Sequence, residues 1–434
     1  MRELKAAIIG SGSTYTPELI EGFIEKQKSL NFQIIYLEDI SREKLEITGN
    51  LAKRMLLSKG FKGKIVLTED PDAAVSGADY IFAQIRAGEM AARIRDEKIP
   101  RKYGLLGQET TGAGGFMNAL RTVPAMLDIA RRIEKLAPNA WLINFSNPSG
   151  IVAEALLNHT RVKMLGLCNN FVNMSARIAK ITGDAGFDYD YIGLNHLSWI
   201  TSIRSGGKEL LAKSGQSDDS QLPPDSVLRC IPGLENEKEL FEAIPAIPCG
   251  YLNYFYLRDE QLEKCIKAER TRGEICVDLE KSLLEQYKNP DLKIKPPELA
   301  QRGGALYSTA AISVVDAIEN DKNEFHAVNV KNAGTLSFMN DNDVIETKCL
   351  VNRSGAAPIA PAKFDNAYII GMMQAVKAYE KLTVRAAVNG SRADALAALM
   401  VHPLIGDFRK AKAVLDDMIQ ANSDYLPKKL TGRN

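Results

Sequence analysis

The sequence predicts an α/β fold in the first part of the chain and an α+β arrangement in the rest. Two observations carry this prediction. Up to about residue 168, short β-rich apolar runs alternate with helical patterns, which is typical of a mostly parallel sheet with helices on both faces. After about residue 200 the alternation stops, and strand-like runs and long amphipathic patterns follow in separate blocks.

In the first part, a predicted strand over residues 5–9 leads into the turn Gly10–Ser13, and a helix opens at Thr16-Pro17. A second strand over 31–40 ends in acids and is followed by a helical pattern over 42–57. Further strands are predicted at 64–70, 80–85, 140–145 and 162–168. We place the domain boundary after residue 165, so that 1–165 forms the first domain and 166–434 the second.

The second part begins with a polar, Pro/Ser-rich stretch over 210–228 that predicts a loop or flap. Residues 259–287 have helical spacing. Three strand-like runs follow, "EFHAVNV", "GTLSF" and "DVIETKCLV", and long helical patterns dominate from Asp365 onward. No flexible linker separates the two parts, so we expect them to share an interface.

Composition narrows the class of protein. The chain has 434 residues, 45% of them hydrophobic and 25% charged, with a net charge of +1, so we expect neither a nucleic acid nor a membrane partner. No apolar run approaches the roughly 18 residues that span a bilayer. The six cysteines show no CxxC pattern, and the first residues do not read as a signal peptide. We therefore expect free thiols and a cytoplasmic protein.

The turn Gly10–Ser13 lies between a strand and a helix, where backbone amides can approach a pyrophosphate. The match to GxGxxG is partial, because Tyr15 replaces the third glycine. Asp39 ends the second strand, where an acid holds ribose hydroxyls, with Glu38 as the alternate; an acid here favours NAD over NADP. The alternative is an empty turn in an unrelated α/β fold. The predicted cofactor residues are Gly10, Ser11, Gly12, Ser13 and Asp39.

Two short apolar segments end alike: "GLCN" contains Cys168, and "GLNH" ends at His196. A Cys–His pair cannot form a disulfide, and two ligands are too few for a closed metal site. An open metal site is one interpretation. The other is a buried thiol beside a satisfied core histidine.

Motifs in order along most of the chain point to one family. They are "GSGSTYTPEL", "QIRAG", "RDEKIPRKYGLLGQETTGAGGF", "NFSNPSG", "GLCN", "GLNHLSW", "YLNYFY", "RGGALYSTAA" and "VNVKNAGT". With them the sequence resembles glycoside hydrolase family four, the NAD- and manganese-dependent glycosidases. Cys168 followed by asparagine resembles the 6-phospho-β-glucosidase branch, although that branch usually has proline at Phe171. The resemblance implies a Rossmann-type NAD-binding domain followed by an α+β domain like that of lactate and malate dehydrogenases.

The family is an exception to catalysis by two carboxylates. The resemblance implies that NAD takes hydride from C3 of the sugar, which acidifies the proton on C2. A base removes that proton and the leaving group is eliminated; water then adds and the hydride returns. It also implies that Cys168 and His196 hold Mn²⁺ or another divalent metal as a Lewis acid. The base it implies is Tyr251, with Tyr254 and Tyr256 as alternates.

Two kinds of side chain are candidates for the substrate. Asn147 and Asn169 can hold sugar hydroxyls, although an Asn-Pro turn alone also explains Asn147. Arg86 and Arg93 follow a strand and can bind a phosphate through their planar guanidinium groups. The alternative is that these arginines pair with Asp96, Glu97 or Glu109. Arg270 and Arg272 are further candidates.

The function that the resemblance implies is hydrolysis of a 6-phospho-β-glucoside, such as a phosphorylated disaccharide. Three alternatives stay open. One is another sugar specificity in the same family, either a 6-phospho-galactoside or an unphosphorylated glycoside. The second is an NAD-dependent 2-hydroxy-acid dehydrogenase, and the third is a non-enzymatic NAD-binding sensor. The resemblance also implies a homo-oligomer, a dimer or a tetramer.

Overall fold

The structure is a computed structural model that describes residues 1–211, 234, 237–302, 307–362 and 364–432. Apart from its first two residues, the loop predicted over 210–228 lies outside the described residues. The helical spacing predicted over 259–287 is confirmed by α11 (Arg258–Lys267) and α12 (Arg272–Tyr287).

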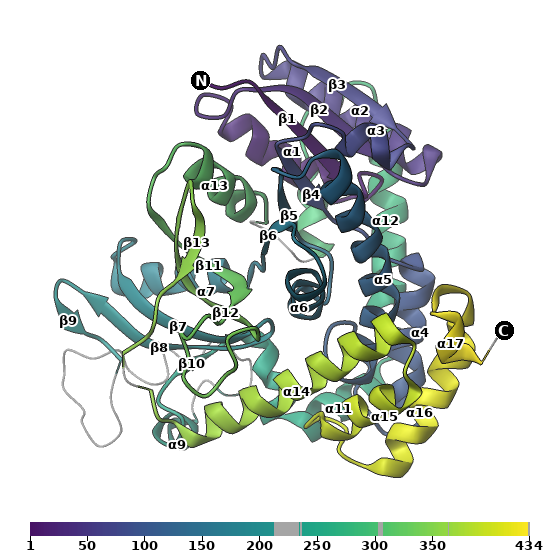
Figure 1. The fold of residues 1–434 in the computed structure, drawn as a ribbon, viewed down its shortest axis with the longest axis vertical. Coiled ribbons are helices and arrows are strands. Elements are labelled where there is room, and N and C mark those ends of the chain that lie inside the picture. Colours follow the sequence, from purple (N-terminus) through teal and green to yellow (C-terminus); the bar gives the residue numbers. More distant parts are fainter. Residues whose placement is uncertain (212–233, 235–236, 303–306, 363, 433–434) are drawn as a thin grey trace.

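Nine strands of the described chain form one sheet in the order β13-β12-β11-β6-β5-β4-β1-β2-β3 (Figure 1). The six strands from the first part of the chain are parallel to one another. They are β1 (Leu4–Ile9), β2 (Phe32–Glu38), β3 (Lys64–Thr68), β4 (Tyr80–Ala83), β5 (Trp141–Asn144) and β6 (Lys163–Gly166). The order 3-2-1-4-5-6 is that of a Rossmann fold and places a topological switch point between β1 and β4. The predicted fold class is confirmed.

Both faces of this sheet are buried, which explains the continuous apolar runs in its strands. On β1, Ala7 and Ile9 belong to one hydrophobic core, and Ala6 and Ile8 belong to the other. Helices cover each face. The helices of the first part are α1 (Thr16–Glu25), α2 (Arg42–Ser58), α3 (Pro71–Val75), α4 (Glu89–Arg101), α5 (Gly112–Leu136) and α6 (Ser149–His159).

The second part of the chain continues the same sheet. Strand β11 (Glu324–Lys331) pairs with the edge of β6 and with β12 (Val344–Asn352), which pairs with β13 (Gly355–Pro358), all antiparallel. The sheet therefore runs across the boundary predicted after residue 165, and that boundary stays a prediction. The strand predicted for "GTLSF" is wrong: residues 334–338 form turns that Asn332 holds, because its side chain bonds both Leu336 N–H and Leu336 C=O.

A second, antiparallel sheet lies beside the first (Figure 1). It contains β7 (Asp188–Leu194), β8 (Leu197–Ser205), β9 (Lys208–Glu209) and β10 (Ile247–Pro248). The 3-10 turn Gly250–Leu252 and α10 (Asn253–Tyr256) follow β10 directly. The motif "YLNYFY" is therefore helical, and it begins at the edge of this sheet.

The remaining helices surround these sheets. They are α7 (Asn170–Thr182), α9 (Lys238–Ala243), α13 (Tyr307–Glu319), α14 (Ala367–Asn389), α15 (Arg392–Val401), α16 (Phe408–Ala421) and α17 (Lys428–Thr431). The long helix α14 packs on α5 and α6, so the carboxyl-terminal part supports the loops of the parallel sheet (Figure 1). No helix in the described part of the chain is long and apolar enough to cross a membrane.

Candidate active site

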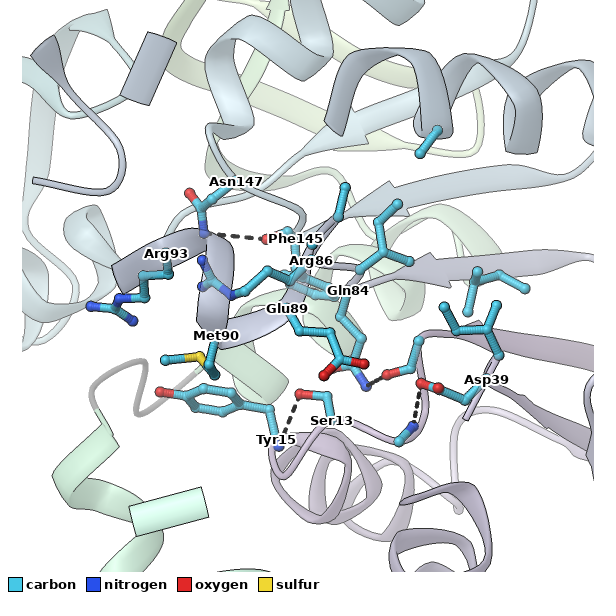
Figure 2. A pocket seen from close by; sticks show the side chains of 18 of the residues that line it. Ser13, Tyr15, Asp39, Gln84, Arg86, Glu89, Met90, Arg93, Phe145 and Asn147 are labelled. Carbon is cyan, nitrogen blue, oxygen red and sulfur yellow. Dashed lines mark hydrogen bonds between the residues drawn. The ribbon is translucent and has the colours of Figure 1, made fainter. Parts of the chain in front are cut away.

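The loops after β1, β2, β4 and β5 open into one cavity of about 920 Å³ at the carboxyl ends of the parallel strands. Ligands of doubly wound α/β proteins bind at this edge. Figure 2 shows side chains from these loops converging on the cavity, with Asp39 and Ser13 on one side and Arg93 and Asn147 on the other. The predicted residues that line it are Gly10, Gly12, Ser13, Asp39, Arg86, Arg93, Asn147, Asn169 and Tyr251.

The backbone of the turn after β1 requires glycine at two positions. Gly10 has a φ of +87°, and a Cβ there would lie 2.9 Å from the carbonyl oxygen of Gln84. A Cβ on Gly12 would lie 2.7 Å from Asp39 Oδ2. The Gly12 N–H donates to that oxygen at 2.7 Å, and Asp39 Oδ1 accepts from Ser41 N–H at 2.8 Å. The turn and the acid predicted to hold the ribose are thus fixed to each other.

Ser11 is not placed for the cofactor role predicted for it. Its side chain is fully buried, and its hydroxyl donates to the Ile8 carbonyl at 2.7 Å. Its N–H donates to the Glu38 carbonyl at 2.7 Å, and its own carbonyl accepts from the hydroxyls of Thr16 and Thr48. Ser11 therefore joins β1, β2, α1 and α2 and does not line the cavity.

His196 lies in the two-residue turn between β7 and β8, with a φ of +65°. That conformation is uncommon for a residue with a side chain and is often found at functional sites. The imidazole is buried and stacks on the ring of Tyr251, with centroids 3.7 Å apart and planes 5° apart. Its Nδ1 lies 3.0 Å from Thr110 Oγ1. His196 thus sits directly behind a residue of the cavity wall.

Cys168 follows the end of β6 and is buried. Burial raises the pKa of its thiol, the negative charge of Glu346 adds to this, and a hydrogen bond with the Asn195 side chain opposes it. Asn195 in turn donates to Glu346 Oε2 at 2.8 Å and accepts from Gly150 N–H at 3.4 Å. Cys168 is therefore a protonated thiol whose surroundings are ordered by polar groups.

The chemistry of this pair fits an open metal site. Burial lowers the pKa of His196 to about 4, so the imidazole is neutral and keeps a lone pair. A thiol must release its proton when it binds a metal, and binding then depends on pH. In residues 1–211, 234, 237–302, 307–362 and 364–432, no three His, Cys, Asp or Glu side chains gather as a ligand set.

Tyr251 connects the metal-binding candidates to the cavity. It lies in the 3-10 turn Gly250–Leu252, lines the cavity and stacks on His196. Burial raises the pKa of its phenol, and the negative charge of Glu109 raises it further, whereas a hydrogen bond with the hydroxyl of Thr110 opposes the shift. In the absence of a nearby cation Tyr251 is thus a neutral phenol.

The two alternates for the base are less well placed. The ring of Tyr254 is 6.2 Å from that of Tyr251, and burial raises the pKa of Tyr254 to about 12. The Tyr256 hydroxyl accepts from Trp199 Nε1 at 2.8 Å. Neither residue lines the cavity.

The arginines predicted to bind a phosphate are ion-paired, as the alternative interpretation expected. Arg86 contacts Glu109 at 2.7 Å, and 28% of its side chain is exposed. Arg93 contacts both Glu97, at 2.9 Å, and Glu109, at 3.1 Å, and only 9% of its side chain is exposed. Figure 2 shows Arg86 and Arg93 on the same side of the cavity as Asn147. Arg86 has the freer guanidinium of the two.

Of the other residues predicted to contact the substrate, Asn147 has the arrangement that most directly indicates a ligand. Its Nδ2 donates to the Phe145 carbonyl at 3.5 Å, whereas its buried Oδ1 has no protein partner. A buried amide oxygen without a partner is costly, so a ligand or water is expected there. Asn169 lines the cavity at the amino end of α7. Arg270 and Arg272 do not line the cavity; they bond Asp278 and Gln301 instead.

Five further residues at or near the site were not predicted from the sequence. Gln108, Thr110, Asn195 and Glu346 contact the metal-binding candidates or hold the residues that do. Arg302 lines the cavity, bonds the Thr14 hydroxyl and lies over the ring of Tyr15 at 5.2 Å. All but Glu346 lie in motifs that carry the family resemblance, but no role was predicted for them. Glu346 gave no signal, because it sits in a strand pattern as an ordinary polar residue.

Comparison with known proteins gives matches along most of the chain. The chain matches the model of the family 4 glycosyl hydrolases over residues 5–184 and the model of their C-terminal domain over residues 191–405. A probable 6-phospho-β-glucosidase of Bacillus subtilis is 40% identical to it, across 98% of this chain and 97% of the relative. A 6-phospho-β-glucosidase of Escherichia coli is 37% identical over the same shares.

Solved structures show the same fold. The 6-phospho-β-glucosidase of Thermotoga maritima, solved with manganese, NAD⁺ and glucose-6-phosphate, has a TM-score of 0.89 and 32% identity, covering 98% of this chain and 99% of that one. Malate dehydrogenase of Plasmodium falciparum, with 14% identity and a TM-score of 0.51 over 89% of this chain and 99% of its own, shares the fold only. On these matches, which cover both parts of the chain, it belongs to the family 4 glycosyl hydrolases.

Proposed function

We propose that this chain hydrolyses 6-phospho-β-glucosides with NAD and a divalent metal ion, Mn²⁺ by preference. The full-length relatives with 40% and 37% identity carry this activity in their names, and the similar Thermotoga structure holds manganese, NAD⁺ and glucose-6-phosphate. One observation in this chain supports the proposal above the others. The glycine turn and Tyr251 line the same cavity, and His196 stacks on the ring of Tyr251.

The two groups that the family implies have matching residues here. Gly10, Gly12, Ser13 and Asp39 are proposed to hold the dinucleotide, and Cys168 and His196 the metal. When bound, NAD accepts and returns hydride at C3 of the sugar, and the metal polarises the neighbouring oxygens as a Lewis acid. Ser11 is left out of the cofactor residues, because its N–H, C=O and hydroxyl are all bonded inside the fold.

Tyr251 is proposed to receive the C2 proton on its Oη. A useful base has a pKa near the working pH, yet burial and the nearby negative groups raise the pKa of this phenol. A positive charge beside the ring is therefore required for the role. The metal ligands proposed next to Tyr251 meet that requirement, because they would place a cation against the stacked pair.

The sugar and its phosphate have separate candidates. Asn147 offers an unpartnered buried oxygen toward a sugar hydroxyl, and Asn169 lines the same wall. For the phosphate we favour Arg86 over Arg93, since Arg86 has one carboxylate partner and more exposure. Glu109 holds both guanidinium groups in the wall, where they can turn toward a dianion.

Three further predictions stay proposals. We propose that the enzyme works in the cytoplasm on an imported phosphorylated disaccharide. We propose that it forms a homo-oligomer, a dimer or a tetramer. We also keep the division into residues 1–165 and 166–434, although the main sheet contains strands from both sides of it.

A panel of nitrophenyl glycosides tests the activity. Each glycoside, with and without a 6-phosphate and in gluco and galacto forms, is incubated with NAD and Mn²⁺. Release of nitrophenol from the 6-phospho-β-glucoside, without net formation of NADH, is the expected result. Preference for the galacto form or for an unphosphorylated glycoside would support the alternative specificity. Accumulation of NADH with a 2-hydroxy acid, and no release of nitrophenol, would support a dehydrogenase.

A further inference from the structure

We propose that Gln108 and Thr110 are positioning residues that select the ring tautomer of His196. They hold the proton on Nδ1, so that Nε2 keeps its lone pair for a metal. The inference rests on the proposed function, because it takes His196 to be a metal ligand. It concerns a hydrogen-bonded chain of three side chains, those of Gln108, Thr110 and His196.

The hydrogen-bonded chain starts from Gln108, and backbone N–H groups fix the orientation of its side-chain amide. One end of the Gln108 amide accepts the N–H groups of Thr110, at 2.6 Å, and Thr111, at 2.8 Å. Only an oxygen can accept two N–H groups, so this atom is Oε1 and not the NH₂. The local backbone thus fixes an acceptor within the motif "GQETTG".

The next link is the Thr110 hydroxyl, which has a single proton. Its Oγ1 lies 3.0 Å from Gln108 Oε1 and 3.0 Å from His196 Nδ1. Gln108 Oε1 has no hydrogen of its own, so the contact between them exists only if the hydroxyl donates to it. The hydroxyl oxygen must then accept from its two remaining partners, the Tyr251 hydroxyl and His196, which places a hydrogen on Nδ1. The reverse arrangement would give up the bond to Gln108.

The consequence for the imidazole concerns metal binding, for which the ring has to be neutral. A neutral ring has one N–H, so a hydrogen on Nδ1 leaves Nε2 as the nitrogen with a free lone pair. The ring cannot turn easily, since it is buried and stacked 3.7 Å from Tyr251. Partners that fix tautomer and orientation in this way are worth about 10- to 100-fold in metal affinity.

The neighbouring threonine provides a matched control. Thr111 is as buried as Thr110, but its hydroxyl lies 3.4 Å from His402 Nε2 and not beside His196. Substitution of either threonine by valine removes one buried hydroxyl and keeps the shape of the side chain. Only Thr110→Val should therefore affect His196.

The test uses the full-length protein, labelled with ¹⁵N-histidine and free of metal, and long-range ¹H–¹⁵N correlation spectra. The His196 signals are identified by their loss in His196→Gln. In the wild type we expect the hydrogen on Nδ1. In Thr110→Val we expect a shift toward the Nε2–H form and a Mn²⁺ affinity about 10- to 100-fold weaker, followed by the electron paramagnetic resonance of free Mn²⁺.

Two conservative variants separate positioning from general damage. Thr110→Ser keeps the hydroxyl, and Gln108→Glu keeps the acceptor, so both should retain the Nδ1–H form. Thr111→Val should change neither the tautomer nor the Mn²⁺ affinity. The proposal would be overturned if Thr111→Val lost both the Nδ1–H form of His196 and the Mn²⁺ affinity. It would also be overturned if the tautomer stayed unchanged in Thr110→Val.

The wild-type spectrum decides the matter even if Thr110→Val fails to fold. A hydrogen on Nε2 of His196 in the metal-free wild type would overturn the inference by itself. The proposed function fails in a different way, namely if the wild type does not bind Mn²⁺ at all. No substrate is used, so the specificity of the glycosidase does not enter the result.

Discussion

The glycine turn and the region around Cys168 and His196 lie at the same edge of the parallel sheet, but they are held differently. The turn is held mainly by main-chain hydrogen bonds between the segments that follow β1 and β2, and the Gly12 N–H donates directly to Asp39. Around Cys168 and His196, side chains from distant parts of the chain make the contacts, namely Thr110, Asn195, Tyr251 and Glu346.

The difference shows which changes each region can tolerate. The turn has no room for a Cβ at Gly12. The Cys168–His196 region instead depends on side chains whose protonation burial has shifted, upward for Cys168 and downward for His196. The first region should therefore be sensitive to steric substitutions and the second to the loss of single polar atoms. The predictions below test that contrast from the largest effect to the smallest.

Cys168→Ser should abolish metal-dependent activity while NAD binding stays close to that of the wild type. A hydroxyl is a poor substitute for a thiolate ligand, and even outer partners of a ligand are worth about 10- to 100-fold. Nitrophenol release at saturating Mn²⁺ and an NAD titration measure the two effects. Cys349→Ser changes another fully buried cysteine that does not line the cavity and should keep activity. Full activity of Cys168→Ser would remove Cys168 from the metal site.

Tyr251→Phe should lower turnover by about 10²- to 10⁴-fold, the usual contribution of a positioned base. The phenylalanine ring still stacks on His196, but it cannot accept the C2 proton. In heavy water the wild-type product should carry deuterium at C2, and the variant should lose that exchange together with turnover. Tyr254→Phe is the matched control and should keep both. Exchange that survives in Tyr251→Phe would move the base to another group.

The sequence predicted the region held by the backbone better than the region held by side chains. The turn at Gly10, the acid at Asp39 and the parallel strands follow from local patterns, because their contacts are close in sequence or repeat with the strands. The same local pattern places Ser11 in the turn, but it does not show that the Ser11 carbonyl is buried against the hydroxyl of Thr48.

The supports of the metal-binding candidates could not be predicted in the same way. Cys168 and His196 were found because two short apolar segments end alike at them, and the family resemblance then implied their role as metal ligands. Thr110 lies 86 positions from His196, and Glu346 lies 151 positions from Asn195. No periodic pattern connects residues so far apart. The ion pairs of Arg93 were among the open alternatives, but only the packing of α4 against the "GQETTG" segment decides between them.

Gly12→Ala should weaken NAD binding by about 10- to 100-fold, or roughly 1.4–2.7 kcal/mol. The new Cβ would lie 2.7 Å from Asp39 Oδ2 and would force that acid away from the place proposed for the ribose. Mn²⁺ affinity should not change, since the metal residues follow β6 and β7. Gly371→Ala in α14, where a Cβ meets nothing within 4 Å, is the control. Equal NAD affinity in Gly12→Ala would contradict the steric argument.

Glu38→Gln tests a buried carboxyl of the turn region, and Glu346→Gln tests a buried carboxyl near the metal residues. Burial and the negative charge of Asp39 raise the pKa of Glu38 to about 7, from 4.5 in the unfolded chain. The folded protein therefore holds this proton more tightly than the unfolded chain does. Below pH 4.5 Glu38 does not lower the free energy of unfolding, because it is protonated in both states. Between pH 4.5 and 7 the free energy of unfolding falls, and above pH 7 the loss is complete, at up to about 3 kcal/mol.

Glutamine is neutral throughout, so Glu38→Gln should raise the melting temperature at pH 8 and leave it nearly unchanged at pH 4.5. Glu346 should behave in the opposite way, although burial raises its pKa as well. Its carboxylate accepts from Tyr191 at 2.6 Å, Asn195 at 2.8 Å and Asn329 at 3.1 Å. The amide of Glu346→Gln would turn an NH₂ toward some of these donors, so this variant should melt lower at pH 8. If Glu38→Gln and Glu346→Gln both melted higher than the wild type at pH 8, the hydrogen bonds to Glu346 would not stabilise its carboxylate as proposed.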